Sequence, residues 1–218
     1  LANYVQAVTA AVKLQAGDRV LQFASLSFDT AAEEIFPCLA AGGTLVLRHA
    51  TMADSVSGFL ESCAQSKVTV LDLPTAYWHE VVTRMEVEGI AWPNSIRHVI
   101  IGGERALPQV LEHWARLIGR KVGLLNTYGP TEATIAATFC DLTGCGCESP
   151  LTADVPIGRP IAHVTVYVLD QKGRPVPIGV AGELHIGGVG VARGYLGRSE
   201  ATATRFIPDP FSGRSGAR

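Results

Sequence analysis

Several features that define other classes of protein are missing from this sequence. Its 218 residues include 18 lysine and arginine against 20 aspartate and glutamate, a formal net charge of -2. It therefore lacks the basic excess that collects nucleic-acid phosphates, and it has no acidic tail. No apolar run approaches the roughly 18 residues of a membrane-spanning helix, and the first residues lack the pattern of a secretory signal. These absences argue against a nucleic-acid-binding or membrane protein and favour a cytoplasmic one.

Cysteine and histidine show no pattern of a disulfide framework or a metal site. The chain has five cysteines, an odd number, and it is large enough for a hydrophobic core to stabilise its fold without disulfides. Cys140, Cys145 and Cys147 lie close together, but without the paired spacing of structural zinc sites and without a neighbouring histidine. The six histidines are scattered. We expect reduced cysteines in loops and no metal-binding or catalytic histidine.

The first part of the chain has the alternating pattern of an α/β fold. Between residues 18 and 126, short β-branched apolar runs alternate with stretches of helical period, as in a buried parallel sheet layered with helices. The predicted strands are Arg19–Phe23, Thr44–Leu47, Val68–Leu71, His98–Ile101 and Val122–Leu125. The predicted helices are Thr30–Ala41, Asp54–Gln65, Thr75–Val87 and Pro108–Ile118.

The sequence changes character after residue 132. Three further strands are predicted at Thr134–Cys140, Val164–Leu169 and Glu183–Ile186, separated by turns rich in glycine and proline and by no long helix. We expect a partial α/β subdomain over residues 1–132 and a partial β-rich, distorted barrel-like subdomain over residues 133–218. Residues 142–156 are predicted to form the most mobile loop.

The most specific segment follows the last predicted strand of the α/β part. Asn126 ends an apolar run, Tyr128 follows, and a Gly-Pro turn precedes Thr131 and Glu132. Such a turn exposes backbone N–H groups, a hydroxyl and a carboxylate where open α/β sheets bind ligands. An aromatic face, a hydroxyl and a carboxylate suit the base, phosphate and Mg²⁺ of a nucleotide. A turn in which Thr131 caps a helix and Tyr128 packs on the sheet fits the spacing equally well.

A glycine-rich segment follows at residues 182–196. Its glycines do not have the spacing of a dinucleotide-binding fingerprint, and no amphipathic helix follows them. We interpret the segment as a strand followed by a tight bend at which backbones approach closely.

Five ordered segments resemble a known family. Residues 126–132 and 182–196 resemble signature motifs of adenylate-forming enzymes, specifically the amino-acid-activating adenylation domains of nonribosomal peptide synthetases. Phe28–Thr30, Ile101–Glu104 and Arg205–Phe211 match further blocks in the same order. Acyl-CoA synthetases and luciferases share the glycine-rich motif more loosely. The resemblance spans essentially the whole chain and implies part of the large N-terminal lobe of such an enzyme.

The resemblance implies a two-step reaction. An amino acid and ATP, with Mg²⁺, would give an aminoacyl-AMP and pyrophosphate, and the phosphopantetheine thiol of a carrier protein domain would then take the aminoacyl group. In-line displacement at the α-phosphate needs positioning and charge neutralisation and no protein nucleophile. The family's roles would place Tyr128 on adenine, Gly102, Gly103, Glu104 and Asn126 in the nucleotide pocket, Thr131 on phosphate, Glu132 on Mg²⁺ and Asp29 on the substrate's α-ammonium.

Other motifs of the family are missing from these residues. The phosphate loop ending in Lys-Gly is expected before Leu1, and the Thr-Gly-Asp motif and the C-terminal lobe with its catalytic lysine after Arg218. We therefore expect a part of a longer enzyme that is inactive alone. A non-catalytic docking module and an acyl-CoA ligase for a carboxylic acid without an amino group stay open. The intact ligand turn opposes the first, and Asp29 opposes the second.

The resemblance also maps the family's side-chain pocket onto scattered positions: Asp29, Thr30, Glu33, Asp72, Ile100, Gly102, Thr127, Ile135 and Ala136. Burying Glu33 and Asp72 without a counter-charge would be costly, so a cationic substrate is the simplest compensation, and Gly102 would leave room for a long one. A weaker resemblance, to lysine-activating pockets, places lysine before ornithine, arginine and β-lysine.

Each acid also has a purely structural interpretation. Thr30 and Glu33 have the spacing of a capping box, and Asp29 could cap the same helix. Asp72, just before Leu-Pro, could start the next helix. The sequence leaves both interpretations open.

Overall fold

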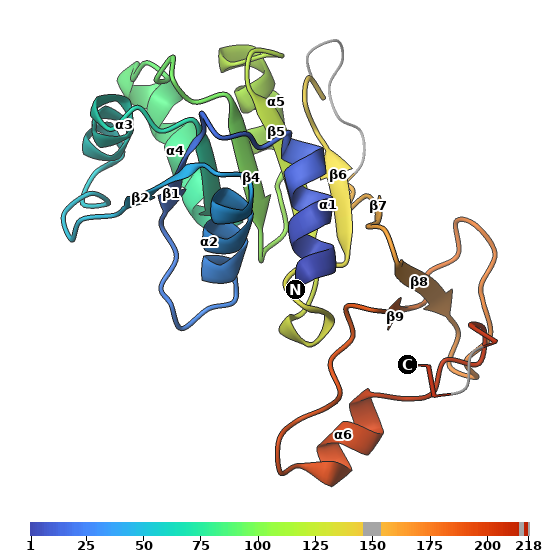
Figure 1. Cartoon of the computed structure of the whole chain (residues 1–218). Helices are drawn as coiled ribbons and strands as arrows, with labels where there is room; N and C mark the ends of the chain where they lie inside the picture. The colour runs from blue at the N-terminus through green and yellow to red at the C-terminus, as the bar shows by residue number, and fades with distance from the viewer. Residues whose placement is uncertain (146–153, 214–215, 218) are drawn as a thin grey trace.

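A seven-stranded sheet forms the body of the molecule (Figure 1). The computed structural model describes residues 1–145, 154–213 and 216–217. In the order β2-β1-β3-β4-β5-β6-β7, the first five strands are parallel and the last two antiparallel. The strands are β1 Arg19–Gln22, β2 Thr44–Leu47, β3 Val70–Pro74, β4 His98–Gly102, β5 Gly123–Tyr128, β6 Thr138–Asp141 and β7 Arg159–Pro160.

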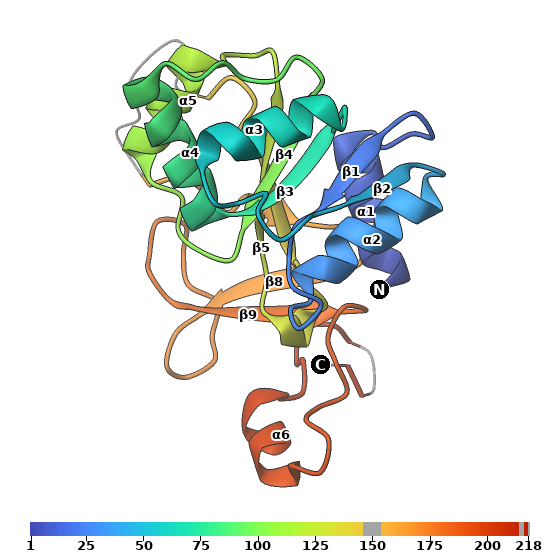
Figure 2. The ribbon, with the colours of Figure 1, turned by 90° about the vertical axis from the view of Figure 1, so that its left-hand side faces the viewer.

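Helices cover both faces of this sheet (Figure 2). They are α1 Ala2–Val12, α2 Thr30–Ala40, α3 Val56–Gln65, α4 Thr75–Glu88 and α5 Pro108–Leu117. One apolar core joins α3, α4 and α5 to strand residues such as Leu71 and Leu73, and the other joins α1 and α2 to residues such as Val70. Side chains alternate along a strand, so Asp72 lies on the α1–α2 face, between Val70 and the end of β3.

A second, two-stranded sheet follows, formed by antiparallel β8 Val164–Leu169 and β9 Glu183–Gly188. Beyond it lies the short helix α6 Ser199–Arg205, which the sequence did not predict. The helix has seven residues and none of them is buried, so it has no apolar periodicity for a pattern to detect. The expected combination of a parallel α/β sheet and a β-rich continuation is confirmed.

The predicted strands and helices are confirmed with shifted ends, with one larger exception. The strand predicted at Thr134–Cys140 is wrong in its first half, because the observed strand begins at Thr138. Thr134 and Ile135 have φ of 62° and 72°, in the left-handed region that a β-branched residue rarely adopts. A sharp turn therefore stands where the apolar pattern predicts extended chain.

The division at residue 132 stays a prediction, since β6 and β7, which follow it, are hydrogen-bonded into the first sheet. Cys147 and most of the predicted loop 142–156 lie outside the described residues. Cys38, Cys63, Cys140 and Cys145 are free thiols. Within the described ranges, no helix is long and apolar enough to cross a membrane.

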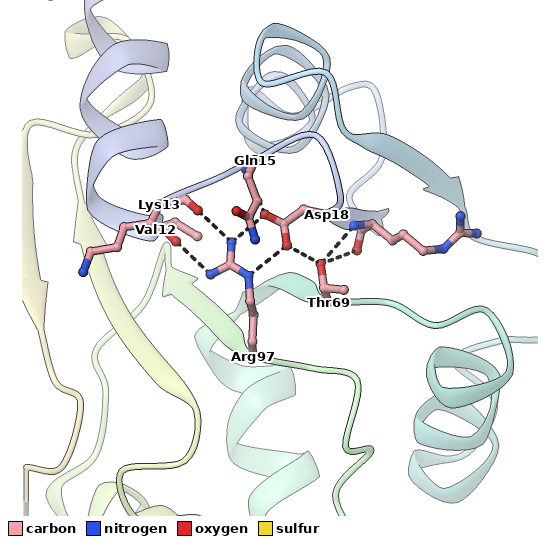
Figure 3. Close-up of polar contacts among 7 residues, drawn as sticks. Val12, Lys13, Gln15, Asp18, Thr69 and Arg97 are labelled. Atoms are coloured by element: carbon pink, nitrogen blue, oxygen red, sulfur yellow. Dashed lines mark hydrogen bonds and ion pairs between the residues drawn. The ribbon is translucent and has the colours of Figure 1, made fainter.

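A charged network closes the edge of the sheet at which the parallel strands begin (Figure 3). The Arg97 guanidinium donates to both Asp18 oxygens, from Nε at 2.8 Å and from Nη2 at 2.6 Å, and to the carbonyls of Val12 and Lys13 at the end of α1. Thr69 Oγ1 also donates to Asp18, at 2.8 Å. Although burial opposes it, these donors hold the pKa of Asp18 below its usual value. The network ties α1 to the starts of β1, β3 and β4.

Candidate active site

The carboxyl ends of the neighbouring strands β4 and β5 carry the turns in which the sequence predicts a nucleotide site. Gly102 ends β4, and Gly103 is exposed with φ of 82°. Tyr128 ends β5 with 40% of its surface exposed, so its ring is free to stack on a planar group. Glu104 is exposed beside these turns. The structure therefore brings three of the predicted nucleotide contacts, Gly103, Glu104 and Tyr128, to the ligand-binding edge of the sheet.

The turn after β5 is built on a close approach of two backbones. A Cβ on Gly129 would lie 2.5 Å from Ala136 Cα, and the Ala137 N–H donates to the Tyr128 carbonyl at 2.8 Å. Thr131 is exposed, and its side chain makes no capping bond at the short 3₁₀ turn η1, Thr131–Ala133. The capping alternative for Thr131 is therefore wrong, and its hydroxyl is accessible to a ligand.

Asn126, predicted in the same pocket, is buried, and its side-chain amide donates to the Pro156 carbonyl at 2.9 Å. This contact secures the segment that leads into β7. Asn126 thus has a structural role, whether or not it also contacts a nucleotide.

Glu132, the predicted Mg²⁺ ligand, is held by the glycine-rich segment. Tyr195 Oη donates to Glu132 Oε1, and the Ala192 N–H donates to the Glu132 carbonyl at 2.8 Å. The Tyr195 hydrogen bond lowers the pKa of Glu132, which keeps the carboxylate ionised. Among the described residues, no group of three or more histidine, cysteine, aspartate or glutamate side chains could hold a metal. A single ionised carboxylate fits Mg²⁺, which is commonly bound by one or two carboxylates together with substrate phosphates.

The glycine-rich segment is the close bend that the sequence predicts. A Cβ on Gly190 would lie 2.8 Å from the Ala133 carbonyl oxygen, and Thr134 Oγ1 donates to the Gly190 carbonyl at 2.7 Å. A Cβ on Gly188, whose φ is 109°, would lie even closer to the His163 carbonyl oxygen. The bend therefore fixes the Glu132 turn against the second sheet.

Two acids of the predicted side-chain pocket, Glu33 and Asp72, lie in the interior of the molecule, between the sheet and its helices. Glu33, in the first turn of α2, is 5% exposed, and Asp72, in β3, is 3% exposed. Tyr4 Oη donates to Glu33 Oε1, so Glu33 does not return to the Thr30 N–H, and the capping-box alternative is wrong. Asp29 occupies the N-cap position of α2 without a side-chain capping bond. Asp72 does not start α4, since β3 continues to Pro74.

Glu33 and Asp72 lie close enough to influence each other's ionisation, and burial raises the pKa of both. The pKa of Glu33 rises to about 7, and that of Asp72 rises well above its usual value, because each also faces the other's charge or that of Glu34. Asp72 Oδ2 is fully buried and finds no hydrogen-bond partner in the part of the chain that the structure describes. Among the described residues, no lysine, arginine or histidine is paired with either carboxyl. Within the described ranges, the pair is thus an acidic centre without a counter-charge.

The remaining predicted pocket positions have different surroundings. Ile100, opposite Asp72 on β4, belongs with Ile135 and Ala136 to the apolar core on the α1–α2 face. The sequence analysis expects Gly102 to leave room for a long substrate, and this expectation needs correction. The space beside Gly102 is occupied, because a Cβ there would lie 2.5 Å from Thr127 Oγ1. Gly102 accommodates Thr127, which itself donates to the Ile101 carbonyl at 3.2 Å. Thr30 is half-buried at the start of α2.

Three functional neighbours escaped the sequence analysis. Tyr4 has the helical spacing of the buried Val8 and Val12, which marks it as core without revealing the partner of its hydroxyl. Glu34 is buried and accepts the N–H groups of Phe23 and Ala24, each at 2.9 Å, which secures the chain leaving β1. Tyr195 lay inside a recognised motif without an assigned role.

Comparison with known proteins agrees with this geometry. A family model described as "AMP-binding enzyme" matches residues 1–196. The chain belongs to this family of AMP-binding enzymes. It is 46% identical over 208 residues to the isonitrile lipopeptide synthase of Streptomyces coeruleorubidus, an alignment that covers 95% of this chain and 13% of that protein. The chain thus spans a small part of the length of this curated relative.

Solved structures give the same result for the fold. The N-terminal subdomain of NpsA from Klebsiella oxytoca, in complex with 3-hydroxybenzoyl-AMSN, matches with a TM-score of 0.77 at 25% identity, over 97% of this chain and 53% of that one. An artificially fused adenylation–PCP di-domain, NpsA-ThdA, matches with a TM-score of 0.79 at 25% identity, over 97% and 39%. The expected fold, part of the N-terminal lobe of an adenylation domain, is confirmed.

Proposed function

We propose that this chain is the substrate- and nucleotide-binding part of an adenylation domain that activates a basic amino acid, lysine first, as an aminoacyl-AMP for transfer to the phosphopantetheine thiol of a carrier protein domain. The family and the fold support adenylation. The match to a structure that joins an adenylation domain to a PCP supports the carrier domain.

The basic substrate rests on one observation, the buried pair of Glu33 and Asp72 with an oxygen that has no partner. Two neighbouring carboxyls without a counter-charge are destabilising in a folded protein. A substrate ammonium would supply the missing charge, and each charge-assisted hydrogen bond would contribute roughly 1.5–3 kcal/mol. A neutral side chain would leave both acids unpaired, which disfavours it.

In the proposed reaction, a carboxylate oxygen of the amino acid bonds to the α-phosphorus of ATP, and the bond from that phosphorus to the bridging oxygen breaks as pyrophosphate leaves. The protein's contribution is to position two anions and to neutralise their charge. Mg²⁺, when bound, would supply positive charge at the phosphates, and Glu132 is the residue proposed to hold it.

The remaining residues are proposed to bind and orient. Tyr128 would stack on adenine, and Asn126 and the turn of Gly102, Gly103 and Glu104 would line the nucleotide pocket. Thr131 would contact a phosphate oxygen. Asp29, at the start of α2, would pair with the α-ammonium and so orient the carboxylate. The side-chain pocket would comprise the acidic pair and six further positions. The eight residues are Thr30, Glu33, Asp72, Ile100, Gly102, Thr127, Ile135 and Ala136.

Amino-acid-dependent exchange of pyrophosphate with ATP, measured on the full-length protein, tests the proposal. Lysine, ornithine, arginine and β-lysine would be compared with leucine, glutamate and norleucine, which is lysine without its ammonium group. We expect exchange to be fastest with a basic amino acid. A preference for an aliphatic or acidic amino acid would refute the basic substrate, and activation only of acids without an amino group would refute amino-acid adenylation.

The 218-residue chain by itself is proposed to be inactive, because the family's phosphate loop and catalytic lysine are not among its residues. Exchange above background by this chain alone would contradict that proposal.

A further inference from the structure

Tyr4 joins the first helix to the acidic pair. It lies in α1, far in sequence from the predicted pocket positions, yet it is only 2% exposed and donates its hydroxyl to Glu33 Oε1. The ring is fixed by the edge of Phe139, with centroids 6.0 Å apart and an interplanar angle of 81°. The hydroxyl is therefore held at one place, on one oxygen of Glu33.

The Tyr4 ring belongs to the apolar core on the α1–α2 face. This core also includes Val8, Ile100, Leu125 and Ile135. Phenylalanine would serve the packing equally well, and a buried tyrosine hydroxyl is tolerated when it finds a hydrogen-bond partner. Glu33 is that partner, so the hydroxyl that Tyr4 places in this core is directed at the acidic pair.

A donor at this position has two effects on Glu33. It restrains the carboxyl, so that a defined oxygen remains for another partner. It also favours the ionised form, opposing the burial that raises the pKa of Glu33. The other titratable groups facing Glu33 are Asp72 from β3, Glu34 from α2 and Asp29 just before α2, and all three are acids. The charges of Glu34 and Asp29 disfavour a negative charge on Glu33.

A protonated Glu33 would remove much of the difference between a cationic and a neutral substrate. We propose that Tyr4 is a positioning residue for Glu33, which holds this carboxylate for the cationic side chain of the substrate and so sets how strongly the pocket discriminates a basic amino acid from a neutral one. The inference rests on the proposed function and adds a residue of α1 to its pocket.

The test is Tyr4→Phe in the full-length protein, which removes one oxygen and keeps the ring. Pyrophosphate exchange would be measured with lysine and with norleucine between about pH 6 and 9. We expect KM for lysine to rise about tenfold with kcat little changed, because Glu33, the proposed partner of the lysine ammonium, loses the hydrogen bond that restrains it. KM for norleucine, which has no side-chain ammonium, should stay the same. The fall in lysine affinity on acidification should begin at higher pH than in the wild type.

Tyr77→Phe is the matched control. The Tyr77 hydroxyl is buried without a hydrogen-bond partner, and its ring packs with Phe23 and Phe59 in the core on the opposite face of the sheet. This variant should leave both KM values and the pH profile unchanged. Equal changes for lysine and norleucine in Tyr4→Phe, or an unshifted pH profile, would overturn the positioning role.

If the Tyr4→Phe protein does not fold, Glu33→Gln provides a second test of the inference. In Glu33→Gln the group to be kept ionised is absent, so the pH dependence of lysine KM assigned to Glu33 should disappear while the Tyr4 hydroxyl keeps an acceptor. An unchanged pH dependence in Glu33→Gln would also overturn the inference.

Failure of the inference is distinguishable from failure of the proposed function. Wild-type preference for a neutral or acidic amino acid refutes both. Wild-type preference for lysine, with lysine and norleucine equally affected by Tyr4→Phe, refutes the role of Tyr4 alone.

Discussion

Buried carboxyls at two places beside the same sheet differ in what surrounds them. Asp18 is 3% exposed, like Asp72, but it accepts from the Arg97 guanidinium, from Thr69 and from the Gln15 N–H, and its pKa is lowered. Glu33 and Asp72 have Tyr4 and each other, no cation among the described residues, and raised pKa values. The same burial therefore gives opposite electrostatic outcomes.

The difference separates an acid that is neutralised within the structure from the acids that we propose to bind the substrate. At the amino ends of the strands, the chain supplies its own counter-charge and joins α1 to three strands. On the α1–α2 face the described residues supply no counter-charge, which costs stability and, under the proposed function, would provide affinity for the cation of the substrate. A buried acid alone thus indicates little, and its partners decide its role.

The largest effect is expected for Arg97→Met. Removing the guanidinium leaves Asp18 as a buried, partly unpaired charge, which should lower the free energy of unfolding by about 3–4 kcal/mol. Urea unfolding of the full-length protein, with a probe in this lobe, would measure the loss. Arg84→Met is the matched control, since its ion pair with Glu88 lies on the surface and should change stability by less than about 0.5 kcal/mol.

This prediction has a pH dependence of known sign. Because the folded pKa of Asp18 is lowered, the stability from this network is fully present above the unfolded pKa, about 4, and is lost as pH falls through the folded value. The penalty of Arg97→Met should therefore shrink on acidification. A penalty that grows at low pH would contradict the assigned pairing.

The next largest effect is expected for Asp72→Asn, on catalysis. Loss of one charge-assisted hydrogen bond to the substrate should lower kcat/KM for lysine by about 10–100-fold and reduce the preference over norleucine. Pyrophosphate exchange measures both. Asp18→Asn should lower stability without changing the preference, and an equal shift of preference in both variants would remove the distinction between the two acids.

A smaller effect of opposite sign is expected for Glu33→Gln without substrate. The pKa of Glu33 is raised to about 7, so the folded state binds more protons than the unfolded state and loses stability as pH rises between about 4.5 and 7. The amide removes this penalty and should raise the free energy of unfolding by about 1–2 kcal/mol at about pH 8, with little change at about pH 5. The exposed Glu80→Gln should show no such dependence in thermal unfolding.

The smallest effect is expected for Thr69→Val, which keeps the shape and removes the hydroxyl that donates to Asp18 and accepts from the Arg19 N–H at 2.9 Å. A loss of about 1 kcal/mol in the free energy of unfolding is expected. In the Asp18→Asn background the loss should be smaller, because the charged acceptor is gone. Equal losses in the two backgrounds would show that Thr69 and Asp18 are not coupled.

Much of the first lobe could be predicted from its period. The runs around β1, β3, β4 and β5 are apolar on both faces, which is typical of a parallel sheet covered by helices. The observed sheet confirms that architecture. The turn at Thr134 and Ile135 could not be predicted, because its left-handed backbone is imposed by the Gly129 approach and the contact with Gly190, which come from distant segments. The same holds for α6, which has no buried face.

The candidate site shows the same division. Asp72 inside an apolar strand is conspicuous in the sequence alone, whereas Glu33 fits a capping box until Tyr4 is seen to hold it. Glu34 lies three residues after the buried Ala31 and four before the buried Cys38, so the helical period places it on the inner face. That period does not distinguish the role of Glu34 from that of Glu33. Only the contacts show that Glu34 accepts backbone N–H groups, whereas Glu33 has no paired cation among the described residues.

The sequence by itself determined the α/β order of the elements, the ligand turn after β5 and the presence of acids where apolar residues are expected, because period and residue chemistry are local properties. Only the tertiary structure decided which acid is neutralised within the protein. That outcome depends on Arg97, Tyr4 and Asp72, residues far apart in sequence whose distances are set when the helices close on the sheet.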